Sequence, residues 1–276
     1  MVLCLAMHPT AYVLAVGRHD GTTDLVDISN GSVICAMAGD GTPAVSALFD
    51  PTGGRLYVGH YSGALRVFDY PSGKLVHELT VADAIKVLCS MGRSTRLALG
   101  IADGSLMVLD TVSYRLVGRR DDLFLVNGLA WLTGSDELVS VSRDLFVRRW
   151  SADLDLLGEV TAHSRSIKVI CASPDGRHWA TAGYDAEVMI WSHNGLVARC
   201  KGHDLPGVAA LSWLDSRTLV SGGWDCTLKV WDIAGECHGT VSLDERKEGL
   251  RHDIVHIAVD EPAGRFAEPR TAGVLR

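Results

Sequence analysis

One short strand ending recurs six times along this 276-residue chain at an almost constant spacing. Each ending is a run of aliphatic or aromatic residues that closes on Asp or Ser. The closing positions are 27, 69, 110, 151, 192 and 232, in the strings LVD, VFD, VLD, RRWS, MIWS and KVWD. The successive differences are 42, 41, 41, 41 and 40 residues. This regular period predicts tandem copies of one structural unit, so most polar residues have a repeat position that explains them.

Each repeat contains four β-rich segments separated by turn residues. In the fifth repeat we expect strands at 166–173, 178–183, 187–192 and 196–201, and the turns between them contain Pro174, Gly176 and Gly195. Proline presets φ and glycine supplies positive φ, so these residues terminate strands for a physical reason. No helical period competes with this pattern. Short strands in units of equal size predict an all-β fold, a β-propeller with four-stranded blades.

Composition limits the classes of partner and compartment. The chain has 26 basic and 33 acidic residues and a net charge of −7, which argues against direct binding of nucleic acid or of a membrane surface. No apolar run approaches the ~18 residues of a membrane helix. The seven cysteines form no CxxC pair, and Cys89 and Cys171 lie in equivalent apolar runs, which indicates reduced buried thiols. We therefore predict a cytoplasmic protein, with the nucleus as the alternative compartment, that is not secreted.

The fifth and sixth repeats resemble those of WD-repeat (Trp-Asp repeat) β-propellers. The sixth has Gly202 and His203, a core strand, then SGGWD and KVWD. In this family a His, a Ser or Thr, the turn Asp and the Trp form a structural hydrogen-bond network. Carried over by position, the resemblance implies this network at His163, Thr181, Asp185, Trp191, His203, Ser221, Asp225 and Trp231. The fourth repeat keeps Ser140, Asp144 and Trp150, with Asp122 where the His would stand.

The first three repeats depart from the family pattern. Asp20 and Asp103 keep the turn Asp, but Ser62 replaces it in the second repeat, and Val26, Phe68 and Leu109 replace the Trp. Without the network we expect these blades to rely on apolar packing. We also expect them to open more easily, since a satisfied buried polar network adds rigidity.

We predict a single domain over 1–276, with repeats at about 1–38, 39–80, 81–121, 122–162, 163–202 and 203–243 and a partial repeat at 250–276. The resemblance implies seven blades, of which six are complete. The seventh starts as DIVHIAVD but lacks a turn Asp and an aromatic third strand. Three explanations stand: a fragment of a longer protein, irregular closure by the tail, or completion by a partner or a second copy. An open blade edge would favour self-association.

Catalytic and metal-binding readings are weak in this sequence. There is no P-loop lysine pattern and no Gly-x-Ser-x-Gly nucleophile elbow. His252 and His256 lie four residues apart and would share one face of a strand, but two ligands without a third make a poor metal site. We therefore predict no catalytic residues, no metal and no cofactor.

A binding surface remains as the source of function. WD-repeat propellers characteristically bind partners on the face that carries the tight turns before the third strands, here called the top face. The predicted partner-binding residues on this face are Tyr61, Lys86, Asn127, Arg143, Lys168, Tyr184 and Trp224. Tyr, Trp and Arg are enriched in interface hot spots, and the lysines and the arginine add positive charge to an acidic protein. An acidic or phosphorylated peptide is the natural ligand.

Taken with the resemblance, these residues predict a non-enzymatic scaffold that binds a protein or peptide on its top face as a subunit of a larger assembly. The alternative is a propeller enzyme of the lactone or sugar hydrolase type, with its site in the central channel. Such an enzyme needs carboxylates or His on several inner strands, whereas the expected inner strands here are mainly apolar, as in IKVICAS and VAALSW.

Overall fold

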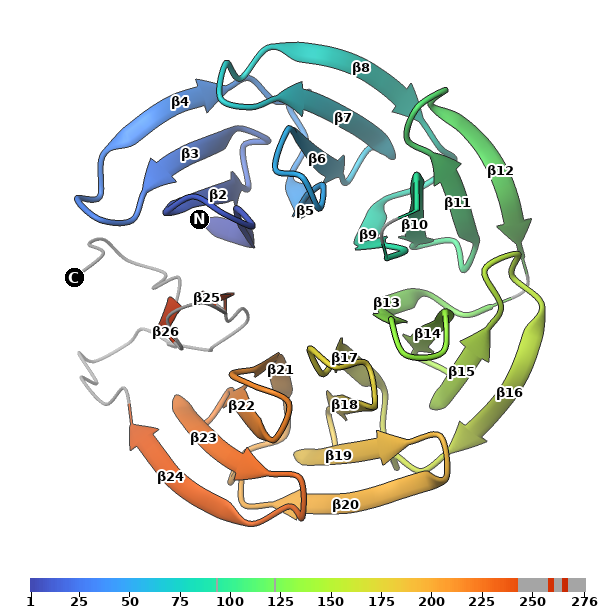
Figure 1. Cartoon of the computed structure of the whole chain (residues 1–276). Helices are drawn as coiled ribbons and strands as arrows, with labels where there is room; N and C mark the ends of the chain where they lie inside the picture. Colours follow the sequence, from blue (N-terminus) through green and yellow to red (C-terminus); the bar gives the residue numbers. More distant parts are fainter. Residues whose placement is uncertain (93, 122, 243–257, 261–264, 268–276) are drawn as a thin grey trace. The chain divides into compact units, whose positions relative to one another are not determined.

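The computed structural model describes residues 1–92, 94–121, 123–242, 258–260 and 265–267. The regular secondary structure in these residues consists of β-strands alone. Contacts between residues divide the chain into two compact units, 1–127 and 128–274. Figure 1 shows the first unit in blue to green and the second in green to red. No helix long and apolar enough to cross a membrane occurs in the described part of the chain.

The first unit holds three antiparallel sheets whose strands follow one another in chain order. The sheets are β1 (Val2–Met7), β2 (Val13–Arg18), β3 (Thr23–Asp27) and β4 (Val33–Met37); β5 (Ala44–Phe49), β6 (Arg55–His60), β7 (Ala64–Asp69) and β8 (Leu75–Thr80); and β9 (Ile85–Ser90), β10 (Arg96–Ile101), β11 (Leu106–Asp110) and β12 (Arg115–Arg120).

The second unit repeats this arrangement with three more sheets, and the first of them begins at the boundary between the units. The sheets are β13 (Val126–Leu132), β14 (Glu137–Ser142), β15 (Phe146–Trp150) and β16 (Leu156–Thr161); β17 (Ile167–Ala172), β18 (His178–Gly183), β19 (Glu187–Ser192) and β20 (Gly195–Lys201); and β21 (Val208–Trp213), β22 (Thr218–Gly223), β23 (Thr227–Asp232) and β24 (Cys237–Ser242). The predicted all-β propeller fold with four-stranded blades is confirmed.

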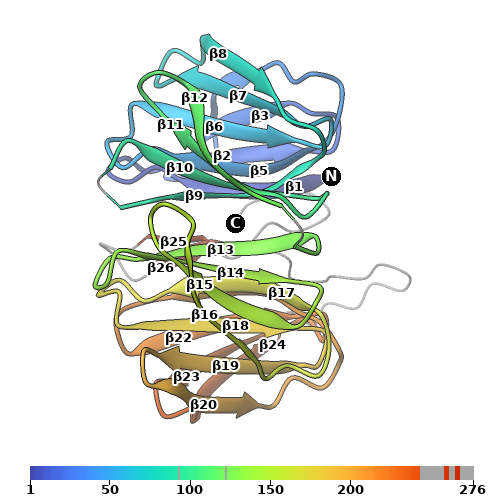
Figure 2. The ribbon, with the colours of Figure 1, turned by 90° about the vertical axis from the view of Figure 1, so that its right-hand side faces the viewer.

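Burial changes systematically across each blade. The second strands are almost wholly buried, as in β10, whereas the fourth strands are largely exposed, as in β12. The apolar core lies between neighbouring blades; in the first unit Leu65 and Val67 of β7 belong to one buried cluster with Leu97 and Leu99 of β10. Figure 2 shows these sheets stacked within the first unit. Side chains on both faces of an inner strand therefore meet a neighbouring blade, which explains why those strands are continuous apolar runs.

The predicted seventh repeat is described only in part. Two short strands, β25 (Ala258–Asp260) and β26 (Arg265–Ala267), pair antiparallel. The remainder of 250–276, including His252 and His256, lies outside the described residues. A seventh blade, and self-association through an open blade edge, therefore stay predictions. The single domain over 1–276 also stays a prediction beside the two compact units.

Candidate interaction surface and its supporting networks

The seven predicted partner-binding residues fall into two groups, one in each unit. Tyr61, Lys86 and Asn127 belong to the first unit, and Arg143, Lys168, Tyr184 and Trp224 to the second. The Tyr61 side chain is 59% exposed. Lys86 and Asn127 are half-buried and already interact with other groups of the protein.

In the second unit, three successive blades bring the four predicted residues into one row. The rings of Tyr184 and Trp224 meet edge to face, with their centroids 5.3 Å apart. The Lys168 Nζ atom lies 5.5 Å from the centroid of the Tyr184 ring, within the range of a cation–π contact. Arg143 is exposed, whereas the other three side chains are half-buried. We call these four residues the Tyr184 surface.

The Tyr184 surface carries two positive charges that no described carboxylate offsets. Burial lowers the pKa of the Lys168 ammonium, and the charge of Arg143 lowers it further. Among the residues that the structure describes, neither side chain takes part in an ion pair. A half-buried ammonium group with a second positive charge near it costs free energy until an anion offsets it, so this geometry favours a negatively charged ligand.

Close backbone approaches hold the two aromatic residues in place. The Tyr184 amide donates to the Ser166 carbonyl oxygen at 3.0 Å, and the Trp224 amide donates to the Gly207 carbonyl oxygen at 2.9 Å. Gly207 has φ = +113°, and a Cβ atom there would run into the Trp224 ring, so the indole lies directly over this glycine. The Trp224 Nε1 and Ser166 Oγ atoms are buried without a hydrogen-bond partner among the described residues.

Beneath Tyr184, the fifth blade contains a chain of four hydrogen-bonded side chains. The His163 Nδ1 atom lies 2.9 Å from Asp185 Oδ2, and its Nε2 atom lies 2.8 Å from Thr181 Oγ1. Trp191 Nε1 donates to the same hydroxyl at 2.8 Å. Burial raises the pKa of Asp185, but the hydrogen bonds from His163 and from the amides of Ser164 and Glu187 outweigh it and the net shift is downward. The ionised carboxylate only accepts, so His163 carries its proton on Nδ1 and the Thr181 hydroxyl donates to Nε2.

The sixth blade repeats this chain of contacts beneath Trp224. His203 Nδ1 lies 2.9 Å from Asp225 Oδ2, and its Nε2 atom lies 2.7 Å from Ser221 Oγ. Trp231 Nε1 donates to Ser221 Oγ at 2.7 Å. In both blades the turn Asp that follows the aromatic residue is therefore tied to the second and third strands. The networks fix the backbone of the tight turns that present Tyr184 and Trp224.

The fourth blade keeps only part of the network. Trp150 Nε1 donates to Ser140 Oγ at 2.8 Å, as in the neighbouring blades. The turn carboxylate of Asp144 pairs instead with Arg148 at 2.7 Å and accepts a short hydrogen bond from Ser142. Asp122, which stands at the His position in the sequence, lies outside the described residues.

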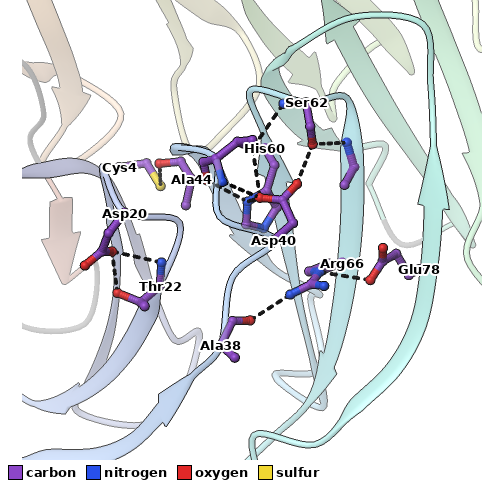
Figure 3. A network of polar contacts seen from close by, with 12 residues as sticks. Cys4, Asp20, Thr22, Ala38, Asp40, Ala44, His60, Ser62, Arg66 and Glu78 are labelled. Carbon is purple, nitrogen blue, oxygen red and sulfur yellow. Dashed lines mark hydrogen bonds and ion pairs between the residues drawn. The ribbon is translucent and has the colours of Figure 1, made fainter.

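The second blade has a polar network that the sequence analysis missed (Figure 3). Asp40 accepts a short hydrogen bond from the Ser62 hydroxyl. It also accepts hydrogen bonds from the amide and from the hydroxyl of Thr42, each at 2.8 Å. The buried His60 side chain lies 3.0 Å from the same carboxylate. Burial opposes ionisation, but the hydrogen bonds from Ser62 and Thr42 lower the pKa of Asp40 to about 2.

In this network the carboxylate stands at the first position of the family pair and not at the second. Asp40 and Ser62 are 22 residues apart, the same offset that separates His203 from Asp225. The carboxylate thus occupies the His position, and a hydroxyl occupies the Asp position. His60 aligns with Gly223, where an added Cβ would run into the His203 ring. The expectation that this blade relies on apolar packing was wrong, because Asp40, Ser62 and the buried His60 preserve a polar network there.

The buried histidines make stability depend on pH. Burial lowers the pKa of both His60 and His203 in the folded protein. Below the unfolded value of about 6.5 the unfolded chain therefore binds protons that the folded chain does not. We expect the free energy of unfolding to fall as the pH decreases from 7 to 5, by at most about 1.4 kcal/mol per pH unit for each histidine. Urea titrations at several pH values measure this slope, and a flat profile from pH 7 to 5 would contradict it.

One exposed group has the composition of a metal site. Asp232, Glu236 and His238 offer ligand atoms within 4.8 Å of one another. The cluster is also explained without a metal: the His238 Nε2 atom lies 2.9 Å from Asp232 Oδ2, and Asp232 Oδ1 accepts the amides of Ala234 and Glu236. The hydrogen bond to Asp232 raises the pKa of His238.

Comparison with known proteins agrees with this geometry. The family described as "WD domain, G-beta repeat" matches residues 154–192 and 194–232. Two of its segments are therefore WD repeats, and the chain has the fold of a WD-repeat β-propeller. Each matched segment contains the fourth strand of one blade and the first three strands of the next blade. The sequence repeat is therefore offset from the blade by one strand. The two segments contain both complete His–Asp–Trp networks, from His163 to Trp191 and from His203 to Trp231.

Several insect proteins described as "Ribosome biogenesis protein WDR12 homolog" are similar to this chain. The protein from Drosophila virilis is 31% identical over 134 residues, which is 39% of this chain and 32% of the relative. The protein from Drosophila sechellia is 30% identical over 137 residues, with 40% and 32% covered, and that from Drosophila mojavensis is 28% identical over 134 residues, with 39% and 32% covered. The match thus spans about a third of each relative's length.

Proposed function

We propose that this protein is a non-catalytic scaffold in ribosome biogenesis, which binds an acidic or phosphorylated segment of another protein on the Tyr184 surface. The observation that carries the proposal is the contact of two aromatic rings beside Lys168 and Arg143, whose charges no described carboxylate offsets. The similarity to ribosome biogenesis proteins supports a role in that process, and it favours a scaffold over the hydrolase alternative. It also favours the nucleus over the cytoplasm as the main compartment.

Alanine at Trp224 or at Arg143 should weaken capture of the partner by about 1–4 kcal/mol if these side chains are hot spots. Trp224 supplies a large ring that packs over Gly207, and Arg143 supplies an exposed charge. The measurement is affinity capture with the tagged chain, with the recovered partner then titrated against each variant. Raising the ionic strength should weaken the wild-type complex more than that of Arg143→Ala, since the arginine contributes through its charge.

Matched controls exist in the same chain. Tyr12 is 58% exposed and lies in the turn between β1 and β2, at the opposite edge of its blade from the tight turns. Arg177 lies in the corresponding turn of the fifth blade and is exposed. Tyr12→Ala and Arg177→Ala should leave capture unchanged. Unchanged capture by folded Arg143→Ala and Trp224→Ala would count against this surface, and absence of ribosome-assembly proteins from the captured material would count against the process.

A further inference from the structure

A cavity of about 420 Å³ lies in the first unit, away from the Tyr184 surface. It opens between the second and third blades at the ends of their first two strands, opposite the end that carries Tyr61. This volume falls in the range of small-ligand pockets. The lining residues are Leu48, Asp50, Pro51, Thr52, Tyr57, Ser90, Ser94, Thr95, Arg96, Leu97 and Thr111.

The wall of the cavity includes large apolar side chains. Tyr57 and Leu97 are almost fully buried members of the core between the two blades, and Leu48 packs against the same core. Burial raises the pKa of Tyr57 to about 12, so its phenol keeps the proton and brings no charge into the cavity. Such a wall favours the aliphatic or aromatic part of a ligand.

The threonines at the rim direct their hydroxyl protons into the protein. Thr52 Oγ1 donates to Asp50 Oδ2 at 2.8 Å, and Thr95 Oγ1 donates to Asp110 Oδ2 at 3.0 Å. Hydrogen bonds from Ser113 lower the pKa of Asp110 to about 2, so that carboxylate is ionised at neutral pH and only accepts. The Thr95 hydroxyl can therefore only donate to Asp110.

Three further hydroxyls donate to backbone carbonyl oxygens. Ser94 Oγ donates to the Met91 carbonyl at 2.6 Å, Thr111 Oγ1 to that of Thr95 at 3.1 Å, and Ser90 Oγ to that of Gly92 at 3.3 Å. A hydroxyl has one proton and two lone pairs. Five lining hydroxyls thus already donate their only proton within the protein. They can offer a ligand only oxygen lone pairs.

Charge completes this description of the cavity. The Asp50 carboxylate adds two acceptor oxygens and a negative charge to the lining. Arg96 also lines the cavity, but it already interacts with other groups of the protein. A ligand that satisfies this lining combines an aliphatic stem with several hydrogen-bond donors and a positive charge.

We propose that this cavity binds a lysine or arginine side chain from a partner protein. The methylene stem packs on Leu48 and Leu97, and the ammonium or guanidinium group donates to the rim hydroxyls and to Asp50. Long basic side chains bury their stems on apolar surface while their charged heads stay at a polar rim, as this site requires. The site would give the protein a second contact with a partner, with the opposite charge preference to that of the Tyr184 surface.

The test uses three small probes and the full chain labelled on its leucine methyl groups. Nα-acetyl-lysine methylamide should shift the methyl resonances of Leu48 and Leu97 saturably. The norleucine counterpart, which has the same stem without the ammonium group, should bind about tenfold more weakly, because it makes no charge-assisted hydrogen bonds. Equal binding of the norleucine probe, preferred binding of the glutamate counterpart, or no response to the lysine probe would each overturn the proposal.

Two variants separate binding from folding. Asp50→Asn keeps the acceptor for the Arg55 amide but removes the charge, and we expect it to weaken the lysine probe about tenfold. Asp215→Asn is the control, because Asp215 lies in the equivalent turn of the sixth blade and also accepts a backbone amide there, that of Arg217. Thermal melting identifies any variant that fails to fold, and Thr52→Val then tests the rim without changing charge. If folded Asp50→Asn and Thr52→Val both bind the lysine probe as the wild type does, the proposal fails.

Discussion

Replacing Thr181 by valine should lower the free energy of unfolding by about 2–4 kcal/mol. The Thr181 hydroxyl is fully buried and serves as both donor and acceptor between His163 Nε2 and Trp191 Nε1. Valine has the same shape but no polar atom, so the substitution leaves an indole N–H and an imidazole nitrogen buried without partners. The cost comes from these stranded groups and not from lost volume, and denaturant titration measures it.

Two companion variants make this prediction specific. Thr161→Val changes an exposed residue at the end of β16 and should change stability by less than about 0.5 kcal/mol. In the background of Trp191→Phe the indole donor is already absent, so Thr181→Val should cost less than it does in the wild type. A Thr181→Val effect as small as that of Thr161→Val would show that the network contributes little to stability.

The second large effect is expected at Gly183, the last residue of β18. A Cβ atom at this position would overlap the Ser166 carbonyl oxygen and would lie 2.9 Å from the Ile167 Cα atom. Both are backbone atoms of the neighbouring strand, so no side chain can rotate out of the way. Gly183→Ala should therefore cost about 3 kcal/mol or more in the free energy of unfolding.

Gly183→Ala should also damage the Tyr184 surface. The same Ser166 carbonyl accepts the Tyr184 amide, and Lys168 lies two residues further along β17. Gly239→Ala is the matched control: this glycine also lies in a strand, but nothing stands within 4 Å of the added Cβ. The control should stay within about 0.5 kcal/mol of the wild type. If the two variants have equal stability and both capture the partner as the wild type does, the close approach at Gly183 contributes neither to stability nor to binding.

Much of the local structure could be predicted from residues alone. The four strands of the fifth blade, expected at 166–173, 178–183, 187–192 and 196–201, appear within one residue at nearly every end. Prediction succeeded there because each strand is an apolar run that ends at turn residues, and these residues set the backbone conformation at their own positions. The resemblance to WD-repeat propellers implied the His, hydroxyl, Asp and Trp positions of blades five and six, and the expected hydrogen bonds join these residues in the structure.

Prediction failed where several positions changed together. Ser62 in place of the turn Asp indicated a lost network, yet Asp40 supplies the carboxylate from the other side of the same contact. A signal was present, because Asp40 and Ser62 keep the 22-residue offset of the family pair. The rim of the cavity had no such signal. Whether Thr52 and Thr95 offer a proton or a lone pair to a ligand depends on which carboxylate each one reaches in the folded chain.

The sequence by itself determined the repeat and the strands, because these depend on a two-residue alternation and on a period of about 41 residues. The resemblance to WD-repeat propellers added the hydrogen-bond networks of the fifth and sixth blades. Only the tertiary structure decided which side chains of different blades meet. Tyr184 and Trp224 are 40 residues apart in sequence and touch because two sheets pack face to face at that edge. The charge of Arg143 acts on Lys168 of the next blade for the same reason. Packing between sheets depends on the summed shape of both faces, which no local pattern of residues records.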